Sequence, residues 1–364
     1  MKQTQETKQK RVFVCTSCTD FLYDPNVTIG GLNIQMNFWG RTFAEHGWDT
    51  LCLTHIKSND NKMIAGMRHV YRNQPKHLQS LYSFIWYFVA LCKYNPDVFL
   101  IRGRGVSLYP LALLSRWFNK KLVFFIAADT NMDKGKEAKQ NFETRLFRKG
   151  VKYLRYIVAQ NSRQQAQTQS NYGKSSLIIP NIWKTDSIDE SESKQYDVLW
   201  VGNIRNVKRP EFFVQLAEMN PNVRFAMVGG SLDAAVYEKT KKSAEKLNNL
   251  DFKGRQGFNE TNRIFTQARV YVCTSSSEGF PNTFLQAWSN GIPVVSTVDP
   301  SDVVKQNELG IICDSVEGLS EAIKQLLSDQ EMYNKYSDNV ANYFKKAHDA
   351  DFQYDRLMEY INEK

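Results

Sequence analysis

Residues 277–297 read SEGFPNTFLQAWSNGIPVVST and organise the second half of the chain. The apolar run ARVYVCTS at 268–275 precedes this stretch, a helix pattern follows its turn, and a second apolar run ends it. The order strand, turn, helix, strand predicts a parallel sheet whose loops collect ligand groups at the carboxyl ends of the strands. We expect Asn282 or Thr283 to cap the helix and Gly291 to end it.

The same alternation of apolar runs and helical patterns continues along the whole chain. In the first half, apolar runs typical of buried parallel strands stand at 11–17, 49–55, 97–103, 121–127, 155–161 and 176–181. A polar, acidic segment at 183–195 reads as a linker, and a second series starts with YDVLWVGN. We therefore predict an α/β protein with two doubly wound parallel-sheet domains, residues 1–185 and 186–345, with ligands in a cleft at the carboxyl edges of the sheets.

Composition narrows the class of protein. The 364 residues are 42% hydrophobic, and the six cysteines are scattered in a chain without a secretory leader, which predicts reduced thiols in a cytoplasmic protein. Cys15 and Cys18 form the only close pair of cysteines, without a second pair at metal-ligand spacing, so we expect no metal site. The longest apolar stretch, at 80–92, is too short to cross a bilayer.

Charge divides the chain unequally. Residues 1–185 contain 27 Lys and Arg against 11 Asp and Glu, a net charge of +16, whereas residues 186–364 contain 20 against 27, a net charge of −7. A basic half suits an anionic membrane surface, a lipid-phosphate substrate or nucleic acid, or it is a solvated surface without a partner. No nucleic-acid-binding motif accompanies the charge, so we favour the membrane.

The loop that contains Glu278 is the first candidate site. It lies at the carboxyl edge of a predicted sheet and at a helix N-terminus, where free N–H groups favour an anion such as phosphate. Glu278 can accept hydrogen bonds from neutral hydroxyls beside that anion, and Gln286, one turn into the helix, can reach the same ligand. A sugar nucleotide offers this mixture of groups. The turn residues expected to contact it are Gly279, Phe280, Pro281, Asn282 and Thr283.

The segment SSSEGFPNTFLQAWSNGIPVVST resembles the signature of family 4 glycosyltransferases, retaining enzymes of the GT-B fold in which two Glu residues hold the donor. The resemblance implies that Glu278 contacts the transferred sugar. The second Glu, which binds the ribose hydroxyls, is replaced here by Gln286. An amide still accepts and donates hydrogen bonds to a neutral diol, so the ribose contact survives this exchange.

The segment YDVLWVGNIRNVKRPEFFVQLA resembles the family segment whose two cations grip the donor diphosphate. Lys208, six residues after Gly202, stands at the position of the family Lys. The family Arg is replaced by Asn203, so Arg205 or Arg209 supplies the second cation. Fixed positive charge there stabilises the leaving diphosphate without a metal.

Further segments extend the resemblance over most of the chain. It implies ligand contacts from the Gly-Gly loop before the first long helix, from the end of RFAMVGGS and from FKGRQGFNETNRIF, namely Gly30, Gly31, Gly229 and Arg255. It also implies that the C-terminal helix, about 346–364, packs back on the first domain. In KLVFFIAADTNM the family His is absent, and Asp129 is the candidate to contact the sugar or the acceptor hydroxyl. Without a side-chain base, the leaving phosphate takes the acceptor proton.

Together these features predict a metal-independent, retaining glycosyltransferase that moves a sugar from a UDP- or GDP-sugar to a hydroxyl of a glycan or lipid-linked glycan in surface-polysaccharide synthesis. No cofactor and no nucleic acid are expected. Trp39, Trp86 and the 80–92 segment fit peripheral contact with the anionic inner face of the cytoplasmic membrane. The alternatives are a nucleotide-sugar epimerase on the same fold and a non-catalytic subunit that binds nucleotide sugars.

Overall fold

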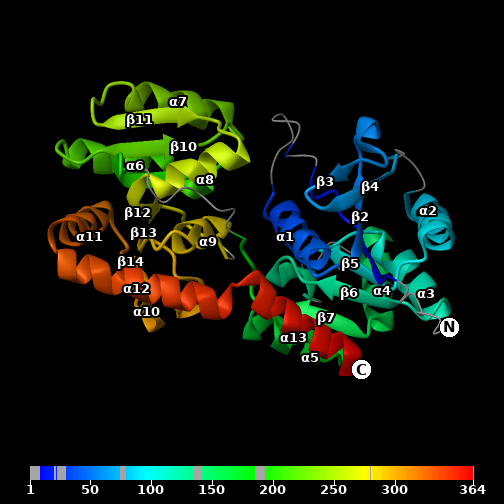
Figure 1. Cartoon of the computed structure of the whole chain (residues 1–364). Helices are drawn as coiled ribbons and strands as arrows, with labels where there is room; N and C mark the ends of the chain where they lie inside the picture. Colours follow the sequence, from blue (N-terminus) through cyan, green and yellow to red (C-terminus); the bar gives the residue numbers. More distant parts are fainter. Residues whose placement is uncertain are drawn as a thin grey trace, which may run out of the picture. The chain divides into compact units, whose positions relative to one another are not determined.

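The computed structural model describes residues 9–19, 22, 30–73, 79–133, 142–184, 193–278 and 280–363. The chain divides into two compact units (Figure 1). Unit 1 comprises Met1–Ile182 and Ala350–Lys364, and unit 2 comprises Trp183–Asp349. Each unit contains one sheet with helices beside it, so the predicted α/β class with two parallel sheets is confirmed.

Unit 1 is built on an eight-stranded sheet in the order β3-β4-β2-β1-β5-β6-β7-β8. Of these described strands only β3 is antiparallel, to β4. The strands are β1 Arg11–Val14, β2 Asp49–Thr54, β3 Met63–Ile64, β4 Met67–Tyr71, β5 Val98–Arg102, β6 Lys121–Phe125, β7 Tyr156–Ala159 and β8 Leu177–Ile178. Strand order changes direction between β1 and β5, and ligands of such sheets bind outside the strand ends at this switch point.

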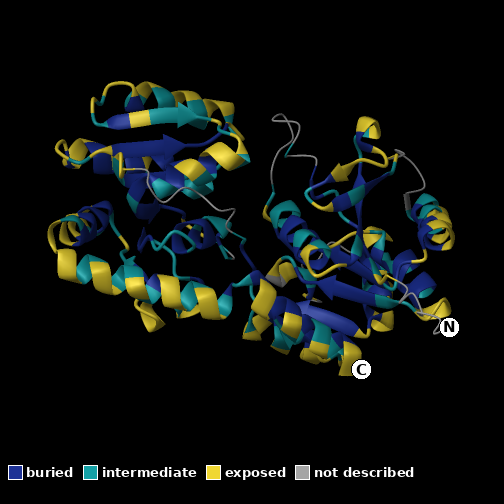
Figure 2. Cartoon of the chain, in the orientation of Figure 1, coloured by how far each residue is buried: buried dark blue, intermediate teal, exposed yellow. Residues whose placement is uncertain are grey.

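The helices of unit 1 cover the sheet and bury its apolar side chains, which Figure 2 shows as a dark interior. They are α1 Gly31–Glu45, α2 Gln79–Tyr94, α3 Leu108–Trp117, α4 Phe142–Tyr153, α5 Ser162–Tyr172 and α13 Ala350–Glu363, with short 3-10 turns at Lys57–Asn59 and Asp129–Asn131. The C-terminal helix α13 lies against α1, and Trp48, in the turn after α1, donates through Nε1 to Tyr354 Oη at 2.8 Å.

Two strands of unit 1 are absent from the sequence prediction. β3 and β4 lie in the segment MIAGMRHVY, where charged and polar residues interrupt the apolar pattern. The two residues that interrupt the pattern have partners from other parts of the chain. His69 is buried against Thr19, and Arg68 pairs with Asp49 at 2.6 Å. Tertiary contacts therefore override a weak local signal.

Unit 2 contains a six-stranded sheet of parallel strands in the order β11-β10-β9-β12-β13-β14. The strands are β9 Tyr196–Val201, β10 Phe225–Val228, β11 Leu250–Gly254, β12 Ala268–Cys273, β13 Val294–Ser296 and β14 Gly310–Ile312. This is the 3-2-1-4-5-6 order of dinucleotide-binding folds. Its switch point lies between β9 and β12.

The helices of unit 2 are α6 Pro210–Met219, α7 Ala234–Ala244, α8 Phe258–Thr266, α9 Asn282–Trp288, α10 Val303–Gln306, α11 Val316–Ser328 and α12 Gln330–Ala347, with 3-10 turns at Asn206–Lys208 and Pro300–Asp302. The prediction for the start of α9 is wrong. Pro281, whose ring holds its φ at −69°, occupies the cap position, and Asn282 is already helical. The hydroxyl of Thr283 is bonded to that of Tyr271 at 2.8 Å and does not cap the helix. The turn after α9 closes at Gly291, whose φ is +65°.

Candidate active site at the switch point of unit 2

The loops that follow β9 and β12 meet at the switch point of unit 2. The hydroxyl of Thr274 donates to the carbonyl of Lys208 at 2.6 Å, and the backbone N–H of Ser276 donates to the carbonyl of Val207 at 2.8 Å. Because β9 and β12 are adjacent parallel strands, two segments almost seventy residues apart in sequence form one ligand-binding edge.

Arg209 joins the two loops. Its Nε donates to the carbonyl of Thr274 at 2.7 Å and its guanidinium also donates to the carbonyl of Ser275 at 3.0 Å. The residue adopts a left-handed backbone conformation, φ 44° and ψ 57°, immediately before Pro210 begins α6. The two hydrogen bonds hold this uncommon conformation, so Arg209 is a positioning residue of the loop.

Glu278 and Lys208 form an ion pair at this edge, and each side chain is about 15% exposed. The hydroxyl of Ser275 donates to the same carboxylate oxygen, Oε1, at 2.7 Å. The structure thus brings together the two residues that the sequence singles out. A carboxylate and an ammonium group held side by side can bind, respectively, neutral hydroxyls and an anion.

Close packing of backbone explains the glycines at this edge. A Cβ atom on Gly229 would lie 2.1 Å from the carbonyl oxygen of Gly202, so only glycine allows the ends of β9 and β10 to approach this closely. The backbone N–H of Gly229 donates to the carbonyl of Gly254 at 2.9 Å. Gly202 and Gly229 therefore shape the loop that carries the cations.

The other predicted residues with positive or amide side chains near this edge of the sheet are exposed or partly exposed. Arg205 is exposed, and its side chain makes no hydrogen bond or ion pair within the described ranges. Asn203, directly after Gly202, is partly exposed. Arg255, after β11, lies close to the backbone of Gly230. Of the two arginines considered for the diphosphate, Arg205 is available and Arg209 is committed to the backbone.

Gln286 is 6% exposed, and its Nε2 donates to Oδ1 of Asn262 in α8 at 2.7 Å. Phe280 packs against the rings of Trp288 and His348. Burial raises the pKa of the Tyr271 hydroxyl well above its ordinary value, so it stays protonated beside Thr283. Gly279, predicted as a ligand contact, lies outside the described residues.

The predicted site residues of unit 1 lie at two loops. Gly30 occupies the cap position of α1 without a side-chain cap, and Gly31 is the first residue of that helix. Asp129 begins the 3-10 turn after β6. Within the described part of the chain, no group of three His, Cys, Asp or Glu side chains is placed to hold a metal ion.

Sequence reasoning missed four residues of the switch point. Thr274 and Ser275 orient Lys208 and Glu278, Asn262 holds Gln286, and Tyr271 holds Thr283. The polar run TSSS directly after a buried strand is the one signal in the sequence that could have identified Thr274 and Ser275, since loops at this edge carry ligand groups.

The sequence of this chain is similar to those of known glycosyltransferases. Residues 181–343 match the protein family described as Glycosyl transferases group 1. The O-antigen biosynthesis glycosyltransferase WbnH of Escherichia coli is 27% identical over 157 residues, which are 41% of this chain and 43% of that protein. The chain spans about half the length of the curated relatives it matches.

Solved structures resemble nearly the whole chain. Sucrose-phosphate synthase from Thermosynechococcus elongatus superposes with a TM-score of 0.73 at 14% identity, covering 98% of this chain and 100% of that one. HepE of Anabaena, solved in complex with UDP, gives a TM-score of 0.71 at 13% identity with the same coverage. The fold is GT-B, and residues 181–343, nearly all of them in unit 2, are similar to the group 1 glycosyltransferase domain.

Proposed function

We propose that this protein is a retaining, metal-independent glycosyltransferase of family 4 that transfers a sugar from a UDP- or GDP-sugar to an acceptor hydroxyl. One observation carries the proposal. Lys208 and Glu278 form an ion pair at the switch point of a group 1 domain, where α/β sheets of this strand order bind nucleotides. The UDP complex of HepE supports a nucleotide-sugar donor.

Each group of the donor has a partner at the switch point. Lys208 and the exposed Arg205 bind the diphosphate and stabilise the negative charge that it gains as it leaves. Glu278, already aligned by Ser275, accepts hydrogen bonds from the sugar hydroxyls. Gln286 donates to Asn262 and offers its side-chain oxygen to a ribose hydroxyl, while residues 280–283 contact the phosphate or the sugar.

The reaction breaks the bond between the sugar C1 and the diphosphate oxygen and forms a bond from C1 to the acceptor oxygen on the same face of the sugar. The proton of the acceptor hydroxyl passes to the leaving phosphate oxygen, so no side-chain base is required. Asp129, after β6, is the residue of unit 1 that we assign to a contact with the sugar or the acceptor hydroxyl.

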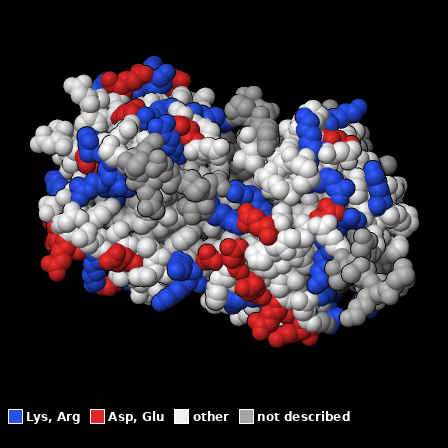
Figure 3. Space-filling view, viewed as in Figure 1, with Lys and Arg blue, Asp and Glu red and all other residues white. Residues whose placement is uncertain are grey.

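The acceptor is a glycan or lipid-linked glycan of a bacterial surface polysaccharide, and we assign its binding to unit 1. The similarity to an O-antigen glycosyltransferase supports this class of acceptor. On the face shown in Figure 3, acidic side chains gather over α13, whereas residues 1–185 carry the net charge of +16.

We also propose peripheral contact with an anionic membrane, at the inner face of the cytoplasmic membrane. The supporting feature is an apolar patch on α2 and at the end of α3, made of the exposed residues Leu81, Ile85, Phe88, Val89, Trp117 and Phe118. The two helices contain no acidic residue. Lys93 lies in the last turn of α2 and Arg116 in the last turn of α3, close in sequence to the residues of the patch. Basic residues beside exposed apolar side chains favour anionic lipid surfaces.

Trp39, one of the two tryptophans predicted for this contact, is 1% exposed and packs against Phe125, so it cannot take part. Trp86 is half-buried, and its ring packs against the core residue Phe13. Among the described helices, none combines the length and hydropathy that crossing a bilayer requires.

Flotation with liposomes tests the membrane contact. The full chain should float with vesicles that contain phosphatidylglycerol, and Ile85→Glu with Val89→Glu should abolish flotation, because both side chains are exposed in the patch. Met219→Glu, which changes an exposed apolar residue of unit 2, is the matched control. Equal flotation of the patch variant and the wild type would reject this surface.

The function is tested by incubating the purified chain with a panel of UDP- and GDP-sugars, with and without lipid-linked oligosaccharide acceptors. Transfer with retention of the anomeric configuration, read by NMR of the product, is the expected result. Conversion of the donor without an acceptor would indicate an epimerase. Nucleotide-sugar binding without turnover of any donor would indicate a non-catalytic subunit.

A further inference from the structure

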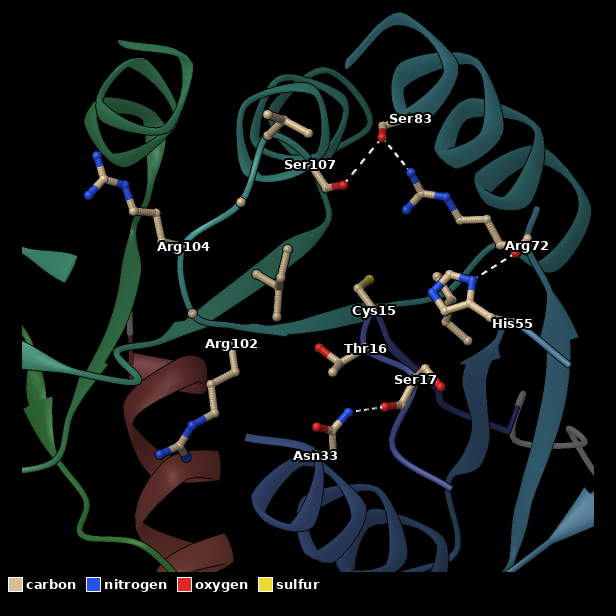
Figure 4. A pocket seen from close by; sticks show the side chains of 15 residues that line it. Cys15, Thr16, Ser17, Asn33, His55, Arg72, Ser83, Arg102, Arg104 and Ser107 are labelled. Carbon is tan, nitrogen blue, oxygen red and sulfur yellow. Dashed lines mark hydrogen bonds between the residues drawn. The ribbon is translucent and has the colours of Figure 1, made fainter. Parts of the chain in front are cut away.

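A cavity of about 440 Å³ opens at the switch point of the sheet in unit 1 (Figure 4). Its walls come from the loops directly after β1, β2, β4 and β5, all at the carboxyl ends of parallel strands. The N-terminal end of α1 contributes Asn33, whose Nδ2 donates to the carbonyl of Ser17 at 2.6 Å. The cavity therefore occupies the position at which open α/β sheets bind ligands.

The charge of this cavity is positive. Arg72, Arg102 and Arg104 line it, and none of its described lining residues is Asp or Glu. Figure 4 shows the side chains of Arg102 and Arg104 both turned away from Arg72, Ser83 and Ser107, and the guanidinium of Arg104 donates to Thr144 of α4. Arg72 is therefore the cation turned toward these hydroxyls, and Arg102 adds buried positive charge to the lining.

Within the described residues, all the groups that contact the Arg72 guanidinium are neutral. Its guanidinium donates to the hydroxyls of Ser83 and Tyr87 and lies over the rings of Tyr82, Trp86 and Tyr87 at 5.1–5.7 Å. Burial is the main reason that the pKa values of the Cys15 thiol and the Tyr87 hydroxyl lie above their ordinary range. Neither group supplies a negative charge at neutral pH.

Arg102 is 8% exposed, and the one hydrogen bond of its side chain within the described residues runs to Oδ1 of Asn181 at 2.7 Å. Burial lowers the pKa of this guanidinium to about 9. The Nε atoms of Arg72 and Arg102 are both buried and have no hydrogen-bond partner within the described residues. Burying unpaired cationic donors is costly, so their retention at a cavity indicates an anionic partner.

Neutral donors complete the lining. The hydroxyl oxygens of Ser83 and Ser107 lie 3.2 Å apart, and Ser107 occupies the N-cap position of α3 without a side-chain cap, so both hydroxyls lie near the positive end of that helix dipole. Figure 4 shows the Arg72 guanidinium and both hydroxyls turned toward one another. A fork of N–H donors beside two hydroxyls suits the several acceptor atoms of an oxyanion.

We propose that this cavity binds a phosphate or carboxylate group of the acceptor substrate, held by Arg72 with Ser83 and Ser107 and favoured by the buried charge of Arg102. That the ligand is the acceptor rests on the proposed glycosyltransferase function. That the cavity binds an anion rests on the residues of the cavity alone. A phosphate would come from a lipid-linked acceptor and a carboxylate from an acidic sugar.

The test measures the affinity of the full chain for inorganic phosphate, D-glucuronate and neutral D-glucose by the ligand-dependent rise in melting temperature. Saturating UDP occupies the donor site throughout. Arg72→Gln should weaken binding of the preferred anion about tenfold or more, because a hydrogen bond to a charged group is lost. Arg116→Gln on the exposed surface of α3 is the matched control for charge and should change the affinity less than about twofold.

The two anions identify the source, since tighter binding of phosphate indicates a phosphorylated acceptor and tighter binding of glucuronate an acidic sugar. If Arg72→Gln does not fold, Arg72→Lys replaces it, and loss of the planar fork should weaken binding severalfold. Wild-type affinity in the folded Arg72 variant would overturn the proposal. So would loss of anion binding in Lys208→Ala, which leaves this cavity intact.

The outcome is separable from that of the proposed function. Anion binding that depends on Arg72, in a chain that turns over no donor, would support the cavity and reject the transferase. Donor turnover that depends on Glu278, together with an anion affinity that does not depend on Arg72, would support the transferase and reject the cavity as an anion site.

Discussion

Replacing Gly229 by alanine tests whether the approach of the β9 and β10 loops shapes the donor site. The added Cβ would lie 2.1 Å from the carbonyl oxygen of Gly202, whereas real Cβ contacts essentially never fall below 3.0 Å. The two backbones would therefore separate by about 1 Å, because neither atom belongs to a flexible side chain. Overpacking of this kind costs about 1–3 kcal/mol, and the rigid partner places this case near the upper value.

Two readouts follow from this displacement. A loss of about 3 kcal/mol in a unit of this size lowers the melting temperature by about 6–12 °C. Because residues 202–208 carry the cations proposed for the diphosphate, UDP affinity measured by calorimetry should fall at least about tenfold. Gly257→Ala is the control, since a Cβ there meets no atom within 4 Å, and the expected cost stays within about 1 kcal/mol. Wild-type stability and UDP affinity in Gly229→Ala would refute the reasoning.

Three further substitutions probe the rest of the account. Arg209→Ala removes the donors to the buried carbonyls of Thr274 and Ser275, so urea unfolding should show a loss of about 2–5 kcal/mol; an unchanged midpoint would contradict its positioning role. Gln286→Glu should change UDP affinity modestly, and a large gain in turnover would show that the native residue impairs the enzyme. Although burial raises the pKa of Asp49, hydrogen bonds from Arg11 and Arg68 lower it overall, so its stabilisation is present above about pH 4 and is lost as pH falls. Asp49→Asn should therefore cost about 1–2 kcal/mol at pH 7 and progressively less as the pH falls below about 4, and a loss that does not change with pH would reject the ion pair.

The parallel sheets were accessible from sequence, because long apolar runs alternate with helical patterns, and so was a shared donor site for Lys208 and Glu278, which the family resemblance implied. The choice between Arg205 and Arg209 was not. Both lie in the same loop, and the left-handed turn at Arg209 that directs its guanidinium onto two carbonyls has no local sequence signal.

Unit 1 was less predictable for a related reason. β4 carries an arginine and a histidine that break the apolar pattern, so the strand that delivers Arg72 to the cavity was not predicted. Arg102 reads as the end of an apolar strand, and its burial emerges only when β5 takes the central position beside β1. Trp39 was expected at a membrane surface, yet the buried face of α1 contains it.

The central claim is that Lys208 and Glu278, at the switch point of unit 2, serve sugar transfer. The most direct test is the transfer rate of Glu278→Gln, measured with the donor that the nucleotide-sugar panel identifies. The account predicts a rate lower by about 100-fold or more, because a charged acceptor to the sugar is lost where position governs the reaction, with UDP affinity changed only slightly. Glu308→Gln, which breaks an exposed ion pair with Lys335, should retain the wild-type rate. Full activity in Glu278→Gln would contradict the claim.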